Sequence, residues 1–437
     1  MDIDKEKETG KTVLNVSSEA VGDEITTGNF KEDVKFSGAF SALKHRNYRL
    51  FFTGQTISIT GTWMQNVAQS WLVYALTSSP LYLGIVNFAA SIPTLLLSPS
   101  AGVIADRVPK RMMLVMTQIS SMLLAFVLAT DVFIGTVRPW HIVVLSFFFG
   151  AVNSFDAPTR QAFVVEMVER EDMANAIALN AVIFNTGRVI GPTLAGIGLA
   201  LLGPGWCFSI NGLSFIPVII GLMMMKVRPY VGAATKDSPL KQLKEGLSYI
   251  RHNKTILTLL MLVAVSNLFA FSYATLLPAF AKDVLHKGPS GLGIMSASSG
   301  FGALMGALMI AWFGHSKRRG MILTFGNLFF PLMIILFAVS RIFYISCLLL
   351  VAVGWGFMLQ NTTINTLIQT IVPDELRGRV MSIYTLFFLG LFPLGSLMAG
   401  AVAEHVSIPA GAEFGAVIAL AFGLFLFWRA PYLRKLA

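Results

Sequence analysis

One arginine stands in the middle of an apolar run. The stretch NTGRVIGPTLAG, residues 185–196, places Arg188, Pro192 and three glycines inside a run of mostly Ala, Ile, Leu, Val and Phe over residues 174–202. A guanidinium is a permanent cation that can bind an anionic or strongly polar acceptor group. Pro192 has no N–H, so it leaves the carbonyl of Arg188, four residues earlier, without its helical partner. These residue types are compatible with a substrate-binding cation and equally with an arginine that stabilises a helix bundle.

Two carboxylates are candidates for carrying a proton. Asp156 lies towards the inner end of the apolar run 139–160, and Glu404 follows the run 380–403 at its outer end. Asp156 and Arg160 are one helical turn apart, so an ion pair at the helix end is the alternative interpretation. The six histidines are scattered without ligand spacing, and the two cysteines lie in or beside apolar runs. We therefore predict no catalytic residues, no metal site and no cofactor.

The elements that must position these residues are membrane helices. The chain of 437 residues is 55% hydrophobic and only 13% charged, about half the charge of a soluble domain. We predict an all-α integral membrane protein with twelve transmembrane helices, because twelve apolar runs are long enough to span a bilayer. The runs lie near residues 49–77, 80–104, 112–130, 139–160, 174–202, 206–225, 255–281, 290–313, 321–339, 342–370, 380–403 and 413–429.

The basic residues predict the orientation of these helices. If the N-terminus is inside, 24 of the 33 Lys and Arg residues fall in inside loops and flanks, and four fall in outside loops. This bias predicts a multi-pass protein of the cell inner (plasma) membrane with both termini cytoplasmic. The net charge of +10 is spread over short loops, so it indicates the bilayer and no nucleic-acid partner. Residues 1–36 are polar and lack an apolar core, which predicts a disordered cytoplasmic tail.

A repeat divides the chain into two six-helix halves. Shifted by 204 residues, 168–196 aligns without gaps on 372–400, with identities that include Gly191/Gly395 and Gly196/Gly400. Gly150/Gly354 continues the same register upstream. Two parallel repeats with a site between them are typical of secondary transporters. We expect halves at 37–225 and 255–429, a cytoplasmic linker at 226–254 whose second part is an amphipathic helix, and a cytoplasmic C-terminus at 430–437.

The loop after the second helix carries the first family motif. GVIADRVPKR, residues 102–111, resembles the motif between helices 2 and 3 of the major facilitator superfamily, with Pro109 where the family has glycine. Gly102, Asp106, Arg107 and Arg111 match the motif, and Lys110 is a conservative change. The resemblance implies that this loop joins the two halves on the cytoplasmic side and docks near PDELRGRV, residues 373–380. A plain basic loop with a capping Asp is the alternative.

The arginine stretch carries the second motif. GRVIGPTLAG resembles the antiporter signature of the same superfamily, which is typical of proton-coupled drug exporters. Its positions here are Gly187, Gly191, Pro192, Ala195 and Gly196, with alanine in place of one glycine. Ordinary packing of small residues around a tolerated proline is the alternative. The preceding segments NSFDAPTRQAFVVEMV, residues 153–168, and NAIALNAVIFNTGR, residues 175–188, resemble the exporter branch that includes the enterobactin exporter and macrolide efflux proteins.

Polar residues on three helices are candidates for a substrate cavity. Gln55, Thr62, Asn66 and Gln69 fall within an arc of about 60° on the first helix. The resemblance implies that helices 1, 4, 7 and 10 line the cavity. It therefore assigns to the cavity these four residues and Asn267, Tyr273 and Gln360. Arg188, on the fifth helix, is expected to belong to the same cavity and to give it a positive potential. Hydrogen bonds between helices are the other role open to these side chains.

The function that follows is secondary active transport. We expect a non-enzyme that exports small amphiphilic molecules, drug- or siderophore-like, by alternating access and proton antiport, and that acts as a monomer. The first helix lacks the acid that many drug:proton antiporters carry there, which leaves the coupling residue open. An uptake carrier or lipid flippase of the same fold is the alternative. The His, Cys and acidic residues provide no convergent catalytic group for a membrane enzyme, and no soluble domain indicates a sensor.

Overall fold

The computed structural model describes residues 40–105, 108–226, 239–312 and 318–436. The tail predicted at 1–36 lies outside the described residues, as do Asp106 and Arg107 of the loop motif. The described helices belong to one compact unit, Ser41–Ala437. Within the described ranges the chain is helical and has no strands, as predicted.

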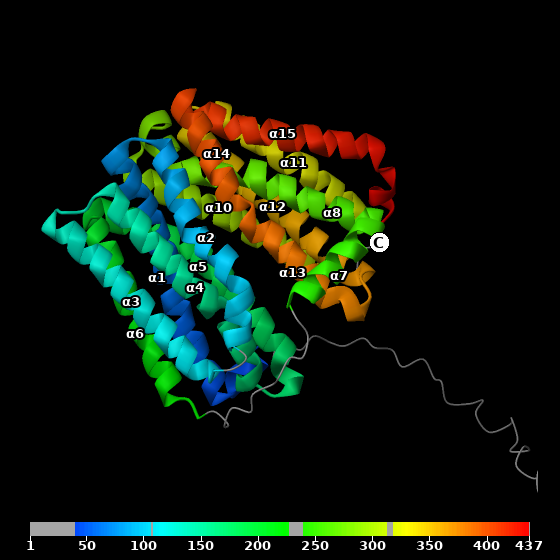
Figure 1. Cartoon of the computed structure of the whole chain (residues 1–437). Coiled ribbons are helices and arrows are strands. Elements are labelled where there is room, and N and C mark those ends of the chain that lie inside the picture. Colours follow the sequence, from blue (N-terminus) through cyan, green and yellow to red (C-terminus); the bar gives the residue numbers. More distant parts are fainter. Residues whose placement is uncertain (1–39, 106–107, 227–238, 313–317, 437) are drawn as a thin grey trace, which may run out of the picture. The chain divides into compact units, whose positions relative to one another are not determined.

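The first half contains six long helices and two short ones (Figure 1). They are η2 (Ser41–Lys44), α1 (Arg46–Thr77), α2 (Pro80–Ala105), α3 (Lys110–Ile134), α4 (Pro139–Met167), η3 (Arg170–Asp172), α5 (Met173–Leu201) and α6 (Pro204–Met224). The helix α7 (Pro239–His252) follows the first half, in the second part of the predicted linker.

The second half has six spans, two of which are interrupted. Its elements are α8 (Lys254–Val265), η4 (Ser266–Ala270), η5 (Phe271–Leu276), α9 (Leu277–Ala279), η6 (Phe280–Val284), α10 (Gly288–Trp312), α11 (Arg319–Val339), α12 (Phe343–Ile371), α13 (Asp374–Gly390), α14 (Phe392–His405), α15 (Ile408–Arg429) and η7 (Pro431–Lys435). The segment from α8 to η6 forms one irregular span, in which η4 and η6 are π-helices and η5 is a 3₁₀-helix. The helices α13 and α14 together form another span.

Ten described segments are long and apolar enough to cross a membrane. The two other long helices, α1 and α5, have 32 and 29 residues. Each is long enough to span at 1.5 Å per residue, but α1 carries the amide and hydroxyl stripe and α5 carries Arg188 and its glycines. The chain is therefore a multi-pass membrane protein, and the two spans with the most polar residues are those that the site predictions single out.

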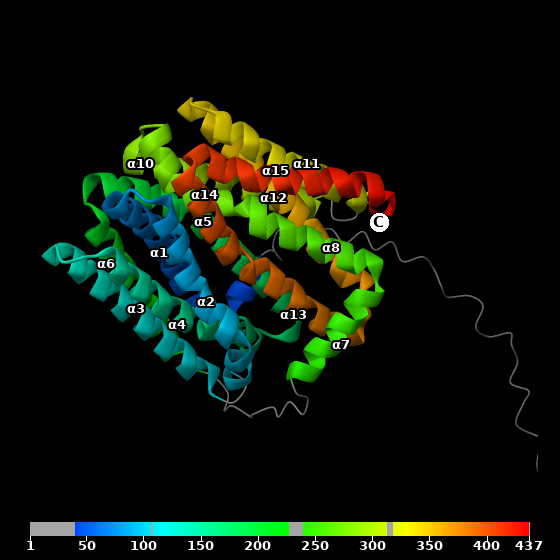
Figure 2. The ribbon, with the colours of Figure 1, turned by 45° about the horizontal axis from the view of Figure 1, so that its top comes forward.

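The helix ends define two ends of the bundle. We name the "basic end" the one at which α1 begins, α2 ends and α13 begins, and the "opposite end" the one at which α1 ends, α2 begins and α14 ends. The two halves meet along α5 with α10 and along α2 with α14, and both pairs lie side by side in the two views (Figures 1 and 2). We call these pairs the α5–α10 seam and the α2–α14 seam.

The glycines that the repeat aligns pack against equivalent helices. A Cβ added at Gly150 would lie 1.9 Å from the carbonyl oxygen of Ala90 on α2, and one added at Gly354 would lie 2.0 Å from that of Ser299 on α10. Gly196 and Gly400 each contact a helix of the other half, α10 and α2 respectively. Only a residue without a side chain allows such close approach of two backbones. The internal repeat is therefore a repeat of helix contacts.

Candidate transport site

The middle of α5 is fixed against α1 by the motif glycines. A Cβ at Gly187 would lie 2.8 Å from Cγ2 of Ile59, and one at Gly191 would lie 2.8 Å from the carbonyl oxygen of Thr60. Ala195, one turn further, is fully buried. The stripe of small residues at every fourth position thus brings the two backbones close together. This contact leaves α5 little freedom to rotate about its axis.

The other side of α5 faces the second half of the molecule. A Cβ at Gly293 of α10 would lie 2.6 Å from Cα of Gly196 and 2.7 Å from the carbonyl oxygen of Pro192. Further along the seam, a Cβ at Gly300 would lie 2.6 Å from the carbonyl oxygen of Arg188. Pro192 removes the helical partner of that carbonyl. The predicted antiporter motif therefore lies at the contact between the halves.

Arg188 is half-buried at the centre of α5. Tyr273, from η5 in the other half, lies nearby, because its hydroxyl is 3.2 Å from that of Ser299 and the next residue, Gly300, packs on the carbonyl of Arg188. The described residues provide the Arg188 side chain with no hydrogen bond and no carboxylate within ion-pair distance. A charge at this depth of a bilayer costs about 2.5–3.5 kcal/mol or more unless it is paired or hydrated. The site therefore contains a cation whose donors are available to a further group.

Some side chains of the polar stripe of α1 are buried against neighbouring helices, and others are exposed. Gln55 is 2% exposed, and its amide nitrogen has no partner among the described residues. Gln69 donates to the hydroxyl of Ser146 on α4 at 2.8 Å. Thr62 donates to the carbonyl of Ser58 on its own helix at 3.0 Å, and Asn66 is exposed. Their assignment to a substrate cavity stays a prediction.

The three predicted cavity residues of the second half are buried. Asn267 donates to the carbonyl of Val263 at 2.9 Å, and the hydroxyls of Tyr273 and Ser299 are 3.2 Å apart. Gln360 is fully buried and donates to Ser266 Oγ at 2.6 Å. Gln360 thus ties α12 to the π-helix η4, and its role in a cavity is likewise untested.

Asp156 lies inside the first half, where α4 packs against α3. Its Oδ1 accepts hydrogen bonds from Thr117 Oγ1 at 2.9 Å and from Gln118 Nε2 at 2.8 Å. Its Oδ2 is 3.6 Å from Nε of Arg160, one turn along α4. The side chain is held in place by three neighbours, and the residue is 8% exposed.

The hydrogen bonds at the opposite end connect the halves. Glu404 of α14 is exposed and accepts from Ser79 Oγ at 2.7 Å. Tyr74 of α1 donates to the carboxylate of Asp283 at 2.5 Å, and Lys282 donates to Ser78 Oγ at 3.3 Å. Neither Tyr74 nor Asp283 was predicted from the sequence. The available signals were the position of Asp283 beside Lys282 in a predicted outside loop and that of Tyr74 near the end of a predicted helix.

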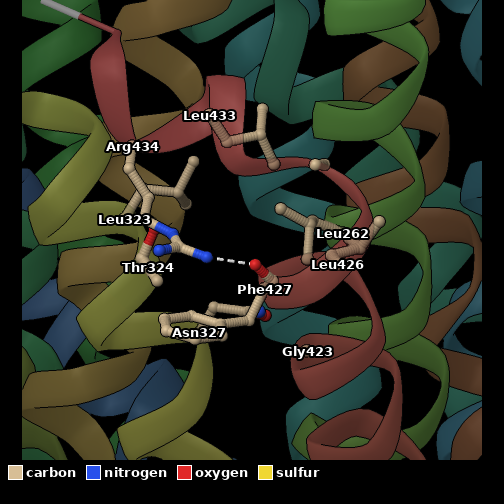
Figure 3. Close-up of a pocket in the computed structure, with 10 residues that line it drawn as sticks. Leu262, Leu323, Thr324, Asn327, Gly423, Leu426, Phe427, Leu433 and Arg434 are labelled. Atoms are coloured by element: carbon tan, nitrogen blue, oxygen red, sulfur yellow. Dashed lines mark hydrogen bonds between the residues drawn. The ribbon is translucent and has the colours of Figure 1, made fainter.

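Two hollows lie among the described residues, and they differ in kind. One of about 400 Å³ opens at the opposite end and is lined by both halves, including Tyr74, Ser78, Glu404 and Ser407. The other, of about 10 Å³, lies inside the second half between α11, α15 and η7, where Arg434 donates to the carbonyl of Phe427 (Figure 3). A space of that size holds at most one water molecule. Of these two hollows, the first is the one large enough to admit a small molecule.

The described part of the loop motif contacts the first half. Lys110 pairs with Glu166 of α4, and Arg111 donates to the carbonyl of Met223, at the end of α6, at 2.6 Å. Gly102 lies in the last turns of α2. The predicted docking of Asp106 and Arg107 near residues 373–380 falls on residues outside the described ranges. Within residues 373–380, Arg379 of α13 pairs with Glu245 of α7, so the linker helix packs against α13.

The arrangement of two helix bundles joined along two glycine seams can be compared with known proteins. Residues 37–435 match the family described as "Transmembrane secretion effector", a family of the major facilitator superfamily. The chain belongs to this family. The predicted membership of the major facilitator superfamily and of its exporter branch is therefore confirmed.

Curated relatives of the family cover most of the chain. The staphyloferrin A transporter of Staphylococcus aureus is 27% identical over 82% of this chain and 90% of that protein. The macrolide efflux protein A of Streptococcus pyogenes is 20% identical, over 84% and 92%. The enterobactin exporter EntS of Citrobacter koseri is 22% identical, over 86% and 90%. The protein is thus a transporter of the major facilitator superfamily, and its relatives include exporters.

Solved structures show the same fold. A bacterial homologue of the human lysosomal transporter Spinster, in an inward-facing and unoccupied conformation, aligns with a TM-score of 0.68 at 14% identity, over 89% of this chain and 96% of that one. The nucleoside transporter NupG aligns with a TM-score of 0.68 at 13% identity, over 90% and 100%. These likenesses confirm the predicted major facilitator fold of two six-helix halves.

Proposed function

We propose that this protein exports small amphiphilic molecules across the cytoplasmic membrane by alternating access, as a monomer with both termini in the cytoplasm. The contact between α5 and α10 carries the proposal. There Gly196 and Gly293 meet backbone to backbone about two helical turns from Arg188, so two smooth helix surfaces can slide or part without disentangling side chains. The printed names of the relatives, which transport siderophores or macrolides, favour the same class of cargo.

The bonds between the halves support alternating access. The bonds of Tyr74, Ser78 and Ser79 to Asp283, Lys282 and Glu404 all lie at the opposite end. The bond of Tyr74 is partly buried, and such a bond to a charged group contributes about 1.5–3 kcal/mol; the bonds of Ser78 and Ser79 are exposed and contribute less. A few such bonds are strong enough to hold one end shut and weak enough to be exchanged during a cycle.

We propose that proton exchange drives export, with Asp156 as the first candidate for the coupling group and Glu404 as the second. Asp156 is nearly buried and bonded by Thr117 and Gln118 of a neighbouring helix. Protonation would remove its charge and weaken its contact with Arg160. Such a change could alter how α4 packs against α3.

Everted membrane vesicles test direction and coupling together. Wild-type vesicles with an acidic interior should accumulate radiolabelled erythromycin or enterobactin, and nigericin with valinomycin should abolish the accumulation. Asp156→Asn should abolish accumulation but retain downhill exchange, because the substrate path is intact. Glu171→Gln, an exposed carboxylate in η3, is the matched control and should behave as wild type.

Accumulation that persists after the gradient is collapsed would show that proton coupling is wrong. Loading of right-side-out vesicles only would instead indicate an uptake carrier. Lipid flipping is tested by exposure of a fluorescent phosphatidylethanolamine to dithionite in proteoliposomes. A flipping rate that depends on the protein, without accumulation of either solute, would replace the proposal of export.

A further inference from the structure

We propose that Arg188 and a column of stacked aromatic rings form the recognition site for the cargo, and that the cargo class is an anionic molecule with a flat aromatic body. The inference rests on the proposed export function and adds its chemical specificity. It concerns one location, the place where α1, α5, η5 and α10 meet.

The backbone around Arg188 is fixed by three helices. Gly187 packs on Ile59 of α1, while the carbonyl of Arg188 itself abuts Gly300 of α10. Ser299, next to Gly300, bonds Tyr273 of η5. The backbone that carries the guanidinium is therefore held in place by helices of both halves. A fixed backbone reduces the conformational entropy that is lost when a ligand binds.

The donors of Arg188 are not used by the described part of the chain. The hydroxyl of Tyr273, on η5 of the other half, is already shared with Ser299. The nearly buried carboxylate of the first half, Asp156, is bonded to Thr117, Gln118 and Arg160. A guanidinium presents a planar fork that matches a carboxylate or a pair of deprotonated phenol oxygens. An anionic group of the cargo would satisfy this fork at the depth where a bare charge is least stable.

An aromatic column begins beside Tyr273. The ring of Phe271 meets that of Tyr273 edge to face, with centroids 6.4 Å apart, and stacks on Phe357 at 4.3 Å and 16°. Phe388 follows Phe357 at 6.5 Å, and Tyr384 stacks on Phe388 at 6.0 Å and 13°. Phe271 and Phe388 are only half-buried, so ring faces and edges remain uncovered by protein. Such a column can hold a flat apolar body by stacking.

The column originates in the irregular span of the second half. η4 is a π-helix and η5 a 3₁₀-helix, so the helix carrying Phe271 and Tyr273 changes its hydrogen-bond pattern twice within eleven residues, Ser266–Leu276. Interrupted helices near the midplane are where transporters place their cargo sites. Ser299 of α10 contacts Tyr273 of this span, and the adjacent Gly300 packs on Arg188, so the cation of one half and the rings of the other are connected through one turn of α10.

Two dyes of the same xanthene skeleton test the charge preference. Fluorescein is a dianion and rhodamine 123 a cation, and binding of each to purified full-length protein in detergent is followed by fluorescence anisotropy. We expect wild type to prefer fluorescein, Arg188→Gln to weaken fluorescein binding about tenfold or more, and rhodamine 123 binding to change less than about twofold. Arg188→Lys should restore a large part of the preference. Phe271→Leu should weaken both dyes, because both stack.

Arg341→Gln is the matched control, since Arg341 bonds carbonyls of its own helix end at the opposite end. It should leave both affinities unchanged. Thermal unfolding without dye establishes that each variant is folded. Wild-type affinity for fluorescein in Arg188→Gln, or a wild type without preference for fluorescein, would overturn the inference. Enterobactin accumulation by everted vesicles that carry the wild-type protein distinguishes this failure from failure of the export proposal, because it measures transport independently of dye binding.

Discussion

The two seams between the halves share a pair of glycines that the repeat aligns, Gly196 in one and Gly400 in the other, but they differ in the neighbouring side chains. On the α5–α10 seam, Gly196 meets Gly293, and Arg188 and Pro192 lie within a few turns of that contact. On the α2–α14 seam, Gly400 meets Pro80 and Leu81, while Ser396 and Phe392 occupy the positions that the repeat pairs with Pro192 and Arg188. One seam thus carries a cation and a proline within a continuous helix, and the other carries a hydroxyl and a ring just after the break between α13 and α14.

The two seams therefore share the close helix contact but differ in the polar groups that lie beside it. Both seams need close backbones, so the glycines are common to both halves. Thr275 donates to Ser396 Oγ at 2.9 Å and Asn87 donates to Thr275 at 3.4 Å, so the α2–α14 seam satisfies its polar groups internally. Arg188 has no such internal bond among the described residues. The α5–α10 seam is therefore the one suited to receive a ligand, and the α2–α14 seam the one suited to hold the halves together.

The largest expected effect comes from adding one methyl group to the α5–α10 seam. Gly293→Ala places a Cβ within 2.9 Å of three backbone atoms of α5, whereas Gly400→Ala has one such contact, at 2.7 Å. Overpacking costs about 1–3 kcal/mol, so transport by Gly293→Ala should fall about tenfold or more, and Gly400→Ala should be milder. Ile294→Leu, an exposed neighbour, is the control. Equal loss in both glycine variants would contradict a functional difference between the seams.

The bond of Tyr74 to Asp283 should control opening at the opposite end. Tyr74→Phe removes a donor to a carboxylate, worth about 1.5–3 kcal/mol when partly buried, so the population open at that end should rise several-fold. Spin labels at Leu76 and Val406, both exposed, report the distance between the halves in a chain whose two free cysteines are replaced. Tyr82→Phe is the matched control, and an unchanged distance distribution in Tyr74→Phe would rule out this role.

The proline inside α5 should matter for transport more than for stability. Pro192→Ala supplies an N–H for the carbonyl of Arg188, so the helix should gain stability while transport falls a few-fold. Ser396→Ala, at the paired position, loses the bond from Thr275 and should cost about 1 kcal/mol of stability with little effect on transport. Thermal unfolding measures the change in stability of each variant, and accumulation in everted vesicles measures the change in transport. Matching effects at the two positions would show that the seams are equivalent.

The smallest effect is expected away from both seams. Asp172, in η3, has its pKa lowered by hydrogen bonds from Ser41 and His45. A depressed carboxyl pKa stabilises the fold above the unfolded-state pKa, and the contribution is lost as pH falls through the folded value. Asp172→Asn should therefore lower the melting temperature slightly at neutral pH and not at strongly acidic pH, with transport unchanged. A clear transport defect would show that this contact also influences the seams.

Sequence patterns predicted the spans closely because apolar length is a local property. The predicted run 174–202 corresponds to α5 at Met173–Leu201, and 342–370 corresponds to α12 at Phe343–Ile371. The last span begins at Ile408, five residues before the predicted 413, because Ser407 accepts a hydrogen bond from the N–H of Ala410 and starts the helix in a polar stretch. The irregular α8–η6 span appeared in the sequence only as a continuous apolar run.

The candidate site was predicted in part. The α5 motif, Arg188 and Tyr273 were named from the sequence, and the structure brings Arg188 and Tyr273 together from different halves. Gln360 and Asn267 were chosen for polarity alone, and both are buried with bonds inside the second half. Periodicity gives the face of a helix, but whether that face meets a neighbour or a cavity depends on helices distant in the sequence.

The sequence by itself determined twelve apolar spans, their charge bias, the repeated glycines and the single arginine at the centre of one span. Each of these depends on residue type and spacing within a few helical turns. Only the tertiary structure decided that Gly196 meets Gly293, that Tyr74 bonds Asp283 and that the ring column begins beside Tyr273. These contacts join residues that are distant in the chain, since Tyr74 and Asp283 are separated by 209 positions. No local pattern specifies which of several similar helix faces will pack together.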